Sequence, residues 1–365
     1  MKAKFTYHDH NYKPVDELPL PDFDCFSVGN MVENFSSANR VLYRYSREKP
    51  RPFIIVTARG CPFKCSFCRK HPEGYRPRSI QNIMAEIKQN YEKYKFNILI
   101  VQDELFAINR KRMTEFCTEL IKNKKEYGWD FDWLMQTHAN SKLDKETLEL
   151  AKESGLYFFS YGLESASPTV LKSMHKKTDV SQIVEAVQLA DELDIGFGGN
   201  LIFGDPAETE DTIRESLMFY FRYGIDPSIF LSYVTPYPGS EIFDYCIEHG
   251  IIKNKLTYYE HIDEHLFNMT QIPDDLFVEW TEFLRTLESS YLMIEATTAK
   301  EMILTEGNSI SDYYNVPVRV LKADCPHCGK ECSYEQMMGA GRFIVPLCQH
   351  CNKRIRINLL EVKVC

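Results

Sequence analysis

Three cysteines lie close together in the segment RGCPFKCSFC, residues 59–68. Cys61, Cys65 and Cys68 follow a C-x3-C-x2-C spacing. Thiolates bind zinc and iron–sulfur clusters, and a closed structural site normally takes four protein ligands. A position left open is typical of a catalytic metal, because a substrate or cofactor must fill it. The loop therefore predicts a catalytic metal or cluster site. A zinc knuckle with a fourth ligand from elsewhere is the alternative.

A second group of cysteines lies near the C-terminus. The segments CPHCGK and CQHCNK give two C-x2-C pairs separated by 19 residues, formed by Cys325, Cys328, Cys348 and Cys351. This spacing predicts a zinc ribbon, in which four thiolates close the site and the metal has a structural role. Cys332 completes a C-x2-C-x3-C spacing with the first pair, so an auxiliary iron–sulfur cluster is the alternative.

The elements that must position these residues alternate along the middle of the chain. Six short runs rich in β-branched or aromatic residues are each followed by a turn and an amphipathic helical pattern. The runs are FIIVT (53–57), NILIVQ (97–102), DWLMQT (132–137), LYFFSYG (156–162), GGNLIF (198–203) and IFLSYV (229–234). Such units in series predict an α/β fold with a parallel sheet, as a partial (βα)6 barrel or an open doubly wound sheet. In both folds the chemistry lies at the carboxyl ends of the strands.

Four regions follow from this pattern. Residues 1–50 are polar and contain scattered prolines, and we expect an arm packed on the outside of the next unit. Residues 51–250 form the predicted barrel core. Residues 251–316 are expected to be a helical extension, with one long helix over 274–296. Residues 317–365 form the predicted zinc ribbon.

Composition and charge narrow the class of protein. The chain has 365 residues, of which 44% are hydrophobic, and no apolar run long enough to span a membrane. We expect a soluble, cytoplasmic protein without a membrane partner. The net charge is -9, but residues 317–365 carry 8 basic and 4 acidic residues and the remainder carries -13. An acidic body disfavours nucleic acid as a partner.

The cysteine loop resembles that of the radical S-adenosylmethionine (radical SAM) enzymes. RGCPFKCSFC matches the family's cluster loop, with the aromatic Phe67 before the third cysteine. The resemblance implies that Cys61, Cys65 and Cys68 hold a [4Fe–4S] cluster whose fourth iron binds the methionine moiety of S-adenosylmethionine. Electron transfer into the sulfonium would then release a 5′-deoxyadenosyl radical, which abstracts hydrogen from a substrate. A reductant such as flavodoxin or ferredoxin is implied as a partner.

The ends of the second and third predicted strands extend the resemblance. QDELF places Asp103 and Glu104 where the family binds the amino group of the cofactor. A pair of residues that caps the next helix is the alternative. MQTHAN places His138 about where relatives often carry arginine. His138 is therefore a candidate catalytic group that donates or accepts a proton, and a structural histidine is the alternative.

The ends of the fourth and fifth predicted strands resemble the cobalamin-associated branch of the family. YGLESAS is similar to its Gly-x-Glu-Ser segment, which implies that Glu164 and Ser165 contact the ribose or the methionine part. IFGDPAETEDTI is similar to a Gly-x-Pro-x-Glu-Thr segment. This implies a wall beside adenine and ribose formed by Gly204, Asp205 and Pro206.

The resemblance covers about residues 50–300 and leaves the substrate open. The branch usually has an N-terminal cobalamin-binding domain with an Asp-x-His-x-x-Gly signature, which is absent here. Cobalamin is then not used, or a separate subunit supplies it, or the chain is shortened at its N-terminus. The substrate is expected to be a small molecule or natural product. The alternatives are an RNA- or protein-modifying enzyme that docks through the ribbon, and a non-catalytic iron–sulfur carrier or adaptor.

Overall fold

The computed structural model describes most of the chain. The described residues are 14–23, 26–33, 50–69, 74–138, 141, 143–223, 229–260, 262, 267–291, 296–305, 318–337, 343–344, 348–351 and 355–358. Internal contacts divide the chain into two compact units, residues 1–35 with 45–279 and residues 36–44 with 280–365.

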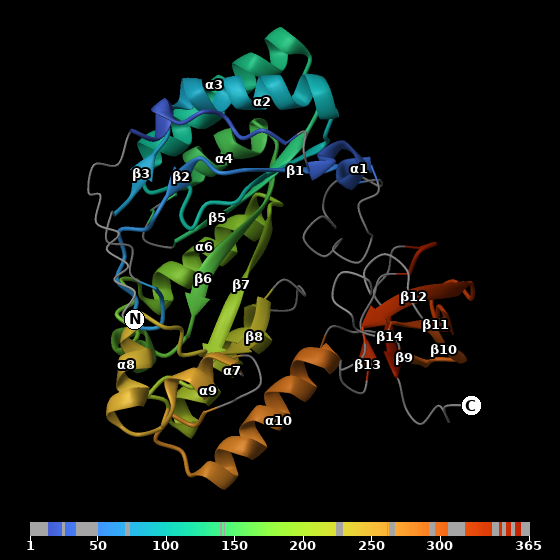
Figure 1. Cartoon of the computed structure of the whole chain (residues 1–365). Coiled ribbons are helices and arrows are strands. Elements are labelled where there is room, and N and C mark those ends of the chain that lie inside the picture. Colours follow the sequence, from blue (N-terminus) through green and yellow to red (C-terminus); the bar gives the residue numbers. More distant parts are fainter. Residues whose placement is uncertain are drawn as a thin grey trace, which may run out of the picture. The chain divides into compact units, whose positions relative to one another are not determined.

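The first unit is built on a six-stranded parallel sheet with the order β1-β4-β5-β6-β7-β8 (Figure 1). Its strands are β1 (Pro52–Ile55), β4 (Ile98–Val101), β5 (Asp132–Thr137), β6 (Leu156–Glu164), β7 (Gly196–Phe203) and β8 (Ile229–Tyr233). The order runs from β1 to β8 without closure, so the α/β fold with a partial (βα)6 barrel is confirmed. Each of the six predicted runs lies on one of these strands.

Helices follow the strands along the chain. They are α2 (Ile80–Tyr94), α3 (Arg110–Tyr127), α4 (Lys145–Glu153), α5 (Pro168–Ser173), α6 (Val180–Glu192), α7 (Glu210–Tyr223) and α8 (Glu241–Glu248). Five of them begin after a side chain that accepts a backbone N–H of the first turn, from Ser79, Asn109, Asp144, Asp179 and Ser240. These caps explain where the chain leaves its turns and becomes helical. Among the described residues, no helix is both long and apolar enough to cross a bilayer.

The core lies between the sheet and these helices. All four residues of β4 are buried, as expected for a strand inside a parallel sheet. Trp133 of β5 packs edge-on against Phe106 and Phe116, with ring centroids 5.9 and 5.1 Å away. Burial of such large rings stabilises the contact between β5 and α3, so the strand ends are held on a rigid base.

The described part of the N-terminal arm packs on the first strand. It contains the short 3-10 helix η1 (Val15–Glu17) and α1 (Val28–Glu33). The carboxylate of Asp16 accepts the backbone N–H of Ser79 at 2.9 Å, just before α2. The ring of Phe23 meets Phe53 of β1 edge-on at 5.1 Å. The arm therefore covers part of the edge strand β1, which an open sheet would otherwise expose.

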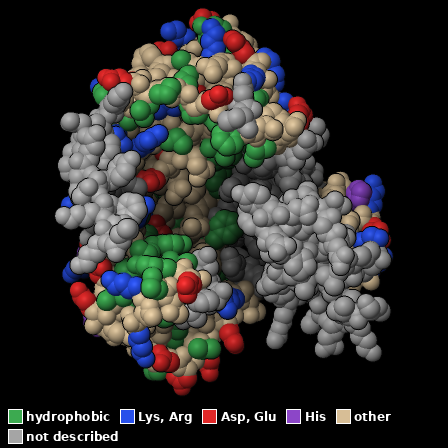
Figure 2. All heavy atoms as spheres, viewed as in Figure 1, with side chains coloured by type: hydrophobic (Ala, Val, Ile, Leu, Met, Phe, Trp, Pro, Cys, Tyr) green, Lys and Arg blue, Asp and Glu red, His purple; other side chains and the backbone are tan. Residues whose placement is uncertain are grey.

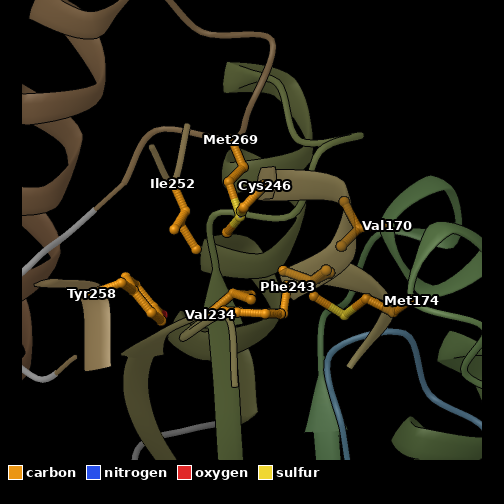
Figure 3. Close-up of a cluster of buried hydrophobic side chains, with 9 residues drawn as sticks. Val170, Met174, Val234, Phe243, Cys246, Ile252, Tyr258 and Met269 are labelled. Atoms are coloured by element: carbon orange, nitrogen blue, oxygen red, sulfur yellow. The ribbon is translucent and has the colours of Figure 1, made fainter. Parts of the chain in front are cut away.

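A separate apolar cluster supports the end of the sheet near α8 (Figure 3). It includes Val170, Met174, Val234, Phe243, Cys246, Ile252, Tyr258 and Met269. The chain then forms α9 (Lys255–Glu260) and α10 (Asp274–Tyr291). Phe67 of the cysteine loop packs against this cluster. The loop therefore rests on a fixed hydrophobic base.

The second unit contains two small sheets. One is antiparallel, with β10 (Glu301–Thr305), β11 (Val318–Asp324) and β12 (Glu331–Met337), and the other joins β9 (Ala296–Thr298), β13 (Phe343–Ile344) and β14 (Arg356–Asn358). The expectation of helix over 251–316 is wrong for residues 296–305, which form β9 and β10. Pairing of β10 with β11 supplies backbone hydrogen bonds across a long sequence separation, which a local pattern does not reveal.

Candidate active site

The cysteine loop and the carboxyl ends of β4, β5 and β6 surround a cavity of about 790 Å³. Its lining consists of Cys61, Phe63, Cys65, Phe67, Cys68, Arg69, Gln102, Asp103, Glu104, Leu105, Gln136, Thr137, His138, Gly162, Glu164, Lys176, Tyr237 and Pro238. The first unit is visibly hollowed on the face shown in Figure 2. A cavity at the carboxyl ends of parallel strands is where this class of fold places its reactive groups.

The cysteine loop is held by backbone hydrogen bonds to two helices. The N–H of Ser66 donates to the carbonyl of Met174 at 3.0 Å, just after α5. The N–H of Ile242 in α8 donates to the carbonyl of Ser66 at 3.1 Å. Within the loop the N–H of Cys68 donates to the carbonyl of Cys65 at 3.2 Å. These bonds fix the directions in which the thiols point.

The three thiols differ in exposure but share one electrostatic environment. Cys65 is buried, Cys61 is half-buried and Cys68 is exposed. Burial raises the pKa of the Cys65 thiol to about 11, and the charge of Lys176 opposes this rise. Burial also raises the pKa of Cys61 and of Cys68, and Lys176 again acts in the opposite direction. A metal ion displaces thiol protons when it binds, so this donor set fits a metal or cluster held by three thiolates.

A buried ion pair lies in the same cavity. Lys176 Nζ is 2.7 Å from Glu164 Oε1, and the two side chains are 4% and 11% exposed. Glu164 has a φ of 62°, where the register between β6 and β7 shifts. A Cβ at Gly162 would lie 2.5 Å from Glu164 Oε1 and 2.6 Å from Lys176 Nζ. A residue without a side chain at position 162 therefore lets the pair lie close to the strand.

Asp103 joins the ends of two neighbouring strands. Its carboxylate accepts the backbone N–H of Thr57 at 2.6 Å and also the hydroxyl of Thr57. Burial raises the pKa of Asp103, while the hydrogen bonds from Thr57 lower it. The helix-capping alternative for Asp103 and Glu104 is wrong, because α3 begins only at Arg110 and is capped by Asn109. Glu104 is exposed and lines the cavity.

His138 lies at the end of β5 against the cysteine loop. Its ring stacks on Phe63, with centroids 4.1 Å apart and an interplanar angle of 19°. Burial, together with the positive charge of Lys176, lowers the pKa of His138 to about 3. The imidazole is therefore neutral at physiological pH. A neutral ring can offer one donor and one acceptor but no positive charge.

Four residues predicted to contact the cofactor are outside the lining of this cavity: Ser165, Gly204, Asp205 and Pro206. Ser165 is buried, and its Oγ lies 3.1 Å from Ser216 Oγ of α7. Asp205 is buried and accepts the N–H of Ala207 at 2.9 Å. These contacts shape the turns that follow β6 and β7. The cofactor contacts expected for these four residues stay predictions.

The cavity also contains residues that the sequence did not single out. Lys176, Phe63, Gln102, Gln136 and Tyr237 all line it. Gln102 and Gln136 lie at or near the ends of predicted strands, and this position could have indicated that they line the site. Lys176 follows a short helix, and only the tertiary fold brings its side chain to Glu164.

A group of cysteines in the second unit has the geometry of a metal site. The Sγ atoms of Cys325, Cys328, Cys348 and Cys351 all lie within 4.8 Å of one another. Two of the sulfur pairs, 325 with 351 and 328 with 348, are each separated by 3.7 Å. Four sulfurs bound tetrahedrally to zinc at about 2.3 Å would be separated by about 3.8 Å. Cys332 Sγ lies 3.5 Å from Cys348 Sγ but is outside this set of four.

Comparison with known proteins agrees with this site. Residues 55–220 match the family model of the radical SAM superfamily, so this part of the chain is a radical SAM domain. An uncharacterized methyltransferase of Pyrococcus horikoshii is 26% identical over 65% of this chain and 48% of its own length. The anaerobic magnesium-protoporphyrin IX monomethyl ester cyclase of Cereibacter sphaeroides is 33% identical over 55% of this chain and 33% of its own length.

A solved structure shows the same fold. It is the radical S-adenosylmethionine methyltransferase TsrM of Kitasatospora setae, with cobalamin and a [4Fe–4S] cluster bound. The TM-score is 0.50 and the identity 17%, over 55% of this chain and 37% of TsrM. The chain spans less than half of each of these three proteins.

Proposed function

We propose that this chain is a radical SAM enzyme of the methyltransferase or cyclase type that acts on a small molecule. Cys61, Cys65 and Cys68 would hold a [4Fe–4S] cluster, and S-adenosylmethionine would bind in the adjoining cavity. The observation that carries the proposal is the convergence of three thiols and the Glu164–Lys176 pair on one cavity. An electron carrier needs no such cavity. This feature therefore favours an enzyme over the carrier alternative.

The residues present fit the two groups. When bound, the cluster and S-adenosylmethionine would supply one-electron cleavage of a carbon–sulfur bond and thereby a carbon radical. The cavity of about 790 Å³ lies in the size range of small-molecule sites, so it has room for a cofactor next to the thiols. Its charged lining includes Glu104, Glu164 and Lys176, which can hydrogen-bond to amino and carboxylate groups.

Other residues would orient and shield the bound molecules. Asp103 fixes the end of β4 to Thr57, so it acts as a positioning residue. His138, stacked on Phe63 and neutral, can hydrogen-bond to a substrate or hold a proton. The carboxamides of Gln102 and Gln136 offer neutral donors and acceptors in the same cavity. Cobalamin stays a prediction, motivated by the bound cobalamin in TsrM.

We further propose that the second unit binds one zinc ion through Cys325, Cys328, Cys348 and Cys351. The sulfur separations of 3.7 Å support it, since they match the edge of a zinc–thiolate tetrahedron. Four thiolates leave no open position, so the role of the metal would be structural. It would replace part of the apolar core that a unit of this size cannot supply.

Anaerobic reconstitution tests the cluster and the reaction together. Reconstituted protein should hold about four irons per chain at the loop and release 5′-deoxyadenosine from S-adenosylmethionine once reduced. Replacing Cys61, Cys65 and Cys68 by Ala should abolish both results. Replacing the buried Cys117 by Ala is the matched control and should preserve both. Full iron content in the triple variant, or no cleavage by a protein with an intact cluster, would contradict the proposal.

A further inference from the structure

The chain leaves helix α5 through a residue in the left-handed conformation. The helix ends at Ser173, and the φ angle of His175 is 53°. The N–H of His175 donates to the carbonyl of Lys172 at 3.1 Å. The N–H of Lys176 donates to the carbonyl of Leu171 at 2.9 Å. This pattern is a Schellman cap, whose left-handed position is usually occupied by glycine.

The two neighbours of His175 in the chain contact different parts of the candidate site. The carbonyl of Met174 accepts the N–H of Ser66 at 3.0 Å and thereby holds the cysteine loop. The buried Lys176 places its Nζ 2.7 Å from Glu164 Oε1, in the cavity. The φ angle of His175 sets the direction in which the chain continues from Met174 to Lys176. Both contacts therefore depend on one backbone conformation.

The side chain of His175 makes a weaker link than its backbone does. Its Nδ1 lies 3.1 Å from Glu241 Oε2 at the start of α8, and the two side chains are 57% and 38% exposed. Such a pair contributes little, because water screens it and two flexible side chains must be ordered. Glycine adopts the left-handed conformation without strain, His and Asn adopt it more often than most residues, and β-branched residues are strongly disfavoured there. A substitution at residue 175 should therefore act mainly through the backbone.

We propose that His175 is a positioning residue for cofactor binding. Its left-handed backbone conformation places Lys176 in the cavity and, through Met174, fixes the cysteine loop. This rests on the proposed function, because S-adenosylmethionine would bind in the cavity that Lys176 lines. His175 is exposed and is not among the residues that line the cavity. It therefore acts through its two neighbours in the chain and not by touching the cofactor.

Substitutions that differ in their tolerance of a left-handed backbone test this proposal. His175→Gly and His175→Asn remove the imidazole and keep the conformation accessible. His175→Val also removes the imidazole, but its branched side chain disfavours the conformation. Glu241→Gln removes the ion pair and leaves the backbone of residue 175 unchanged. Together these variants separate the backbone of His175 from its side chain.

Lys95→Val is the matched control for backbone strain. Lys95 is also exposed, has a φ angle of 47° and caps the C-terminal end of α2. It lies just before β4, near the amino end of that strand, whereas the cavity lies at the carboxyl ends. Both Val substitutions should lower the free energy of unfolding to a similar extent in urea titrations. The one at residue 175 should also disturb the candidate site, and the one at residue 95 should not.

The first readout is the dissociation constant of S-adenosylmethionine from the reconstituted enzyme, measured by anaerobic calorimetry. His175→Val should raise it at least about 10-fold, because a displaced Lys176 loses charge-assisted contacts. His175→Gly, His175→Asn, Glu241→Gln and Lys95→Val should match the wild type. An unchanged constant in His175→Val, or in His175→Ala should the Val variant not fold, would overturn the proposal. So would a constant raised equally in His175→Gly, because the side chain would then be responsible.

Alkylation of Cys65 in the cluster-free protein gives a second readout, which needs no cofactor. Cys65 is 8% exposed and precedes Ser66, whose N–H the carbonyl of Met174 accepts. Iodoacetamide should modify Cys65 at least about 10-fold faster in His175→Val than in the wild type, because local opening of the loop exposes the thiol. Mass spectrometry of the peptide would measure the rate, and His175→Gly and Lys95→Val should match the wild type. Equal rates in all variants would overturn the proposal, whereas a wild type that binds no S-adenosylmethionine would count against the proposed function.

Discussion

Lys176 influences the other titratable residues of the cavity. Its charge lowers the pKa of Cys61, Cys65 and Cys68 against the effect of burial. It also lowers the pKa of His138 in the same direction as burial. Lys176 is itself buried, and the carboxylate of Glu164, 2.7 Å away, compensates its charge. The pair is thus the electrostatic centre of the candidate site.

The first prediction concerns this pair. Lys176→Met or Glu164→Gln alone leaves one buried charge without its partner, which should lower the free energy of unfolding by about 3–5 kcal/mol. The double variant removes both charges and should be less destabilised than the sum of the single variants. Urea titration of the cluster-free proteins would give a coupling energy of about 1–3 kcal/mol.

The exposed pair of Lys145 and Glu192 is the control for that cycle. Their side chains are 53% and 56% exposed, so water screens the interaction. Lys145→Met and Glu192→Gln should therefore be nearly additive. A coupling energy for Glu164 and Lys176 no larger than for the exposed pair would show that the buried contact contributes nothing specific.

The second prediction is a dependence of stability on pH at His138. Its pKa is about 3 in the folded state and about 6.5 when unfolded, so protonation favours unfolding. The contribution of the neutral imidazole to the free energy of unfolding is fully present above pH 6.5 and is lost as pH falls. At pH 5 the loss should be about 2 kcal/mol relative to pH 7.5. Urea titrations of the wild type and of His138→Gln at both pH values measure it.

His138→Gln should lack this part of the pH dependence, whereas His175→Gln should keep it. His175 is the control because its side chain is 57% exposed. If His138→Gln lost as much stability as the wild type between pH 7.5 and 5, the imidazole would not be held neutral by burial.

At the scale of the element, the turn between β7 and α7 depends on one buried carboxyl group. Glu208 accepts the backbone N–H of Gly204 and is 1% exposed. Burial and the nearby Asp205 together raise the pKa of Glu208 to about 8, against the hydrogen bond from Gly204, which lowers it. Gly204 has a φ of 106°, a conformation that glycine adopts readily. The carboxyl group therefore satisfies the backbone of a turn that other residues would strain.

The third prediction follows from that pKa. The folded state holds a proton on Glu208 that the unfolded state has already lost, so stability should fall as pH rises from about 4.5 to 8. Glu208→Gln keeps an oxygen that can accept the N–H of Gly204 but cannot ionise. Its stability relative to the wild type should rise by about 3–4 kcal/mol between pH 5 and pH 8, as urea titrations would show. Glu215→Gln, also on α7, should have no such effect. A stability difference between Glu208→Gln and the wild type that does not change with pH would contradict the raised pKa of Glu208.

The elements of the barrel could largely be predicted, whereas the contacts of the site could not. Strands such as β5 were identifiable because consecutive apolar residues mark a buried parallel strand. Helix caps depend on local chemistry, as at Ser240, whose hydroxyl oxygen accepts the N–H of Phe243 at 3.1 Å. Lys176 was missed because its partner Glu164 lies 12 residues away, beyond a helix. β9 and β10 were missed because distant strands complete them.

At the scale of the whole molecule, each of the two units has its own core and its own cysteine site. The second unit has a buried cluster that includes Leu321, Ala323, Ile355 and Ile357 together with the cysteines. Cysteines make up a large share of this cluster. The stability of the second unit should therefore depend on metal far more than that of the barrel, whose core contains many large aromatic and aliphatic side chains.

The last prediction separates zinc from an auxiliary cluster in that unit. Cys328→Ser removes one of four thiolates and should release the metal and unfold the second unit, while the barrel and its iron remain. Cys332→Ser should keep the metal, because its sulfur is outside the set of four even though it lies 3.5 Å from Cys348. The two variants make the same chemical change at neighbouring sulfurs, so each is the control for the other. Metal analysis with limited proteolysis should give about one zinc and about four irons per chain for Cys332→Ser and no zinc for Cys328→Ser. About eight irons without zinc in the wild type, or equal metal loss in both variants, would make Cys332 a ligand of a second cluster.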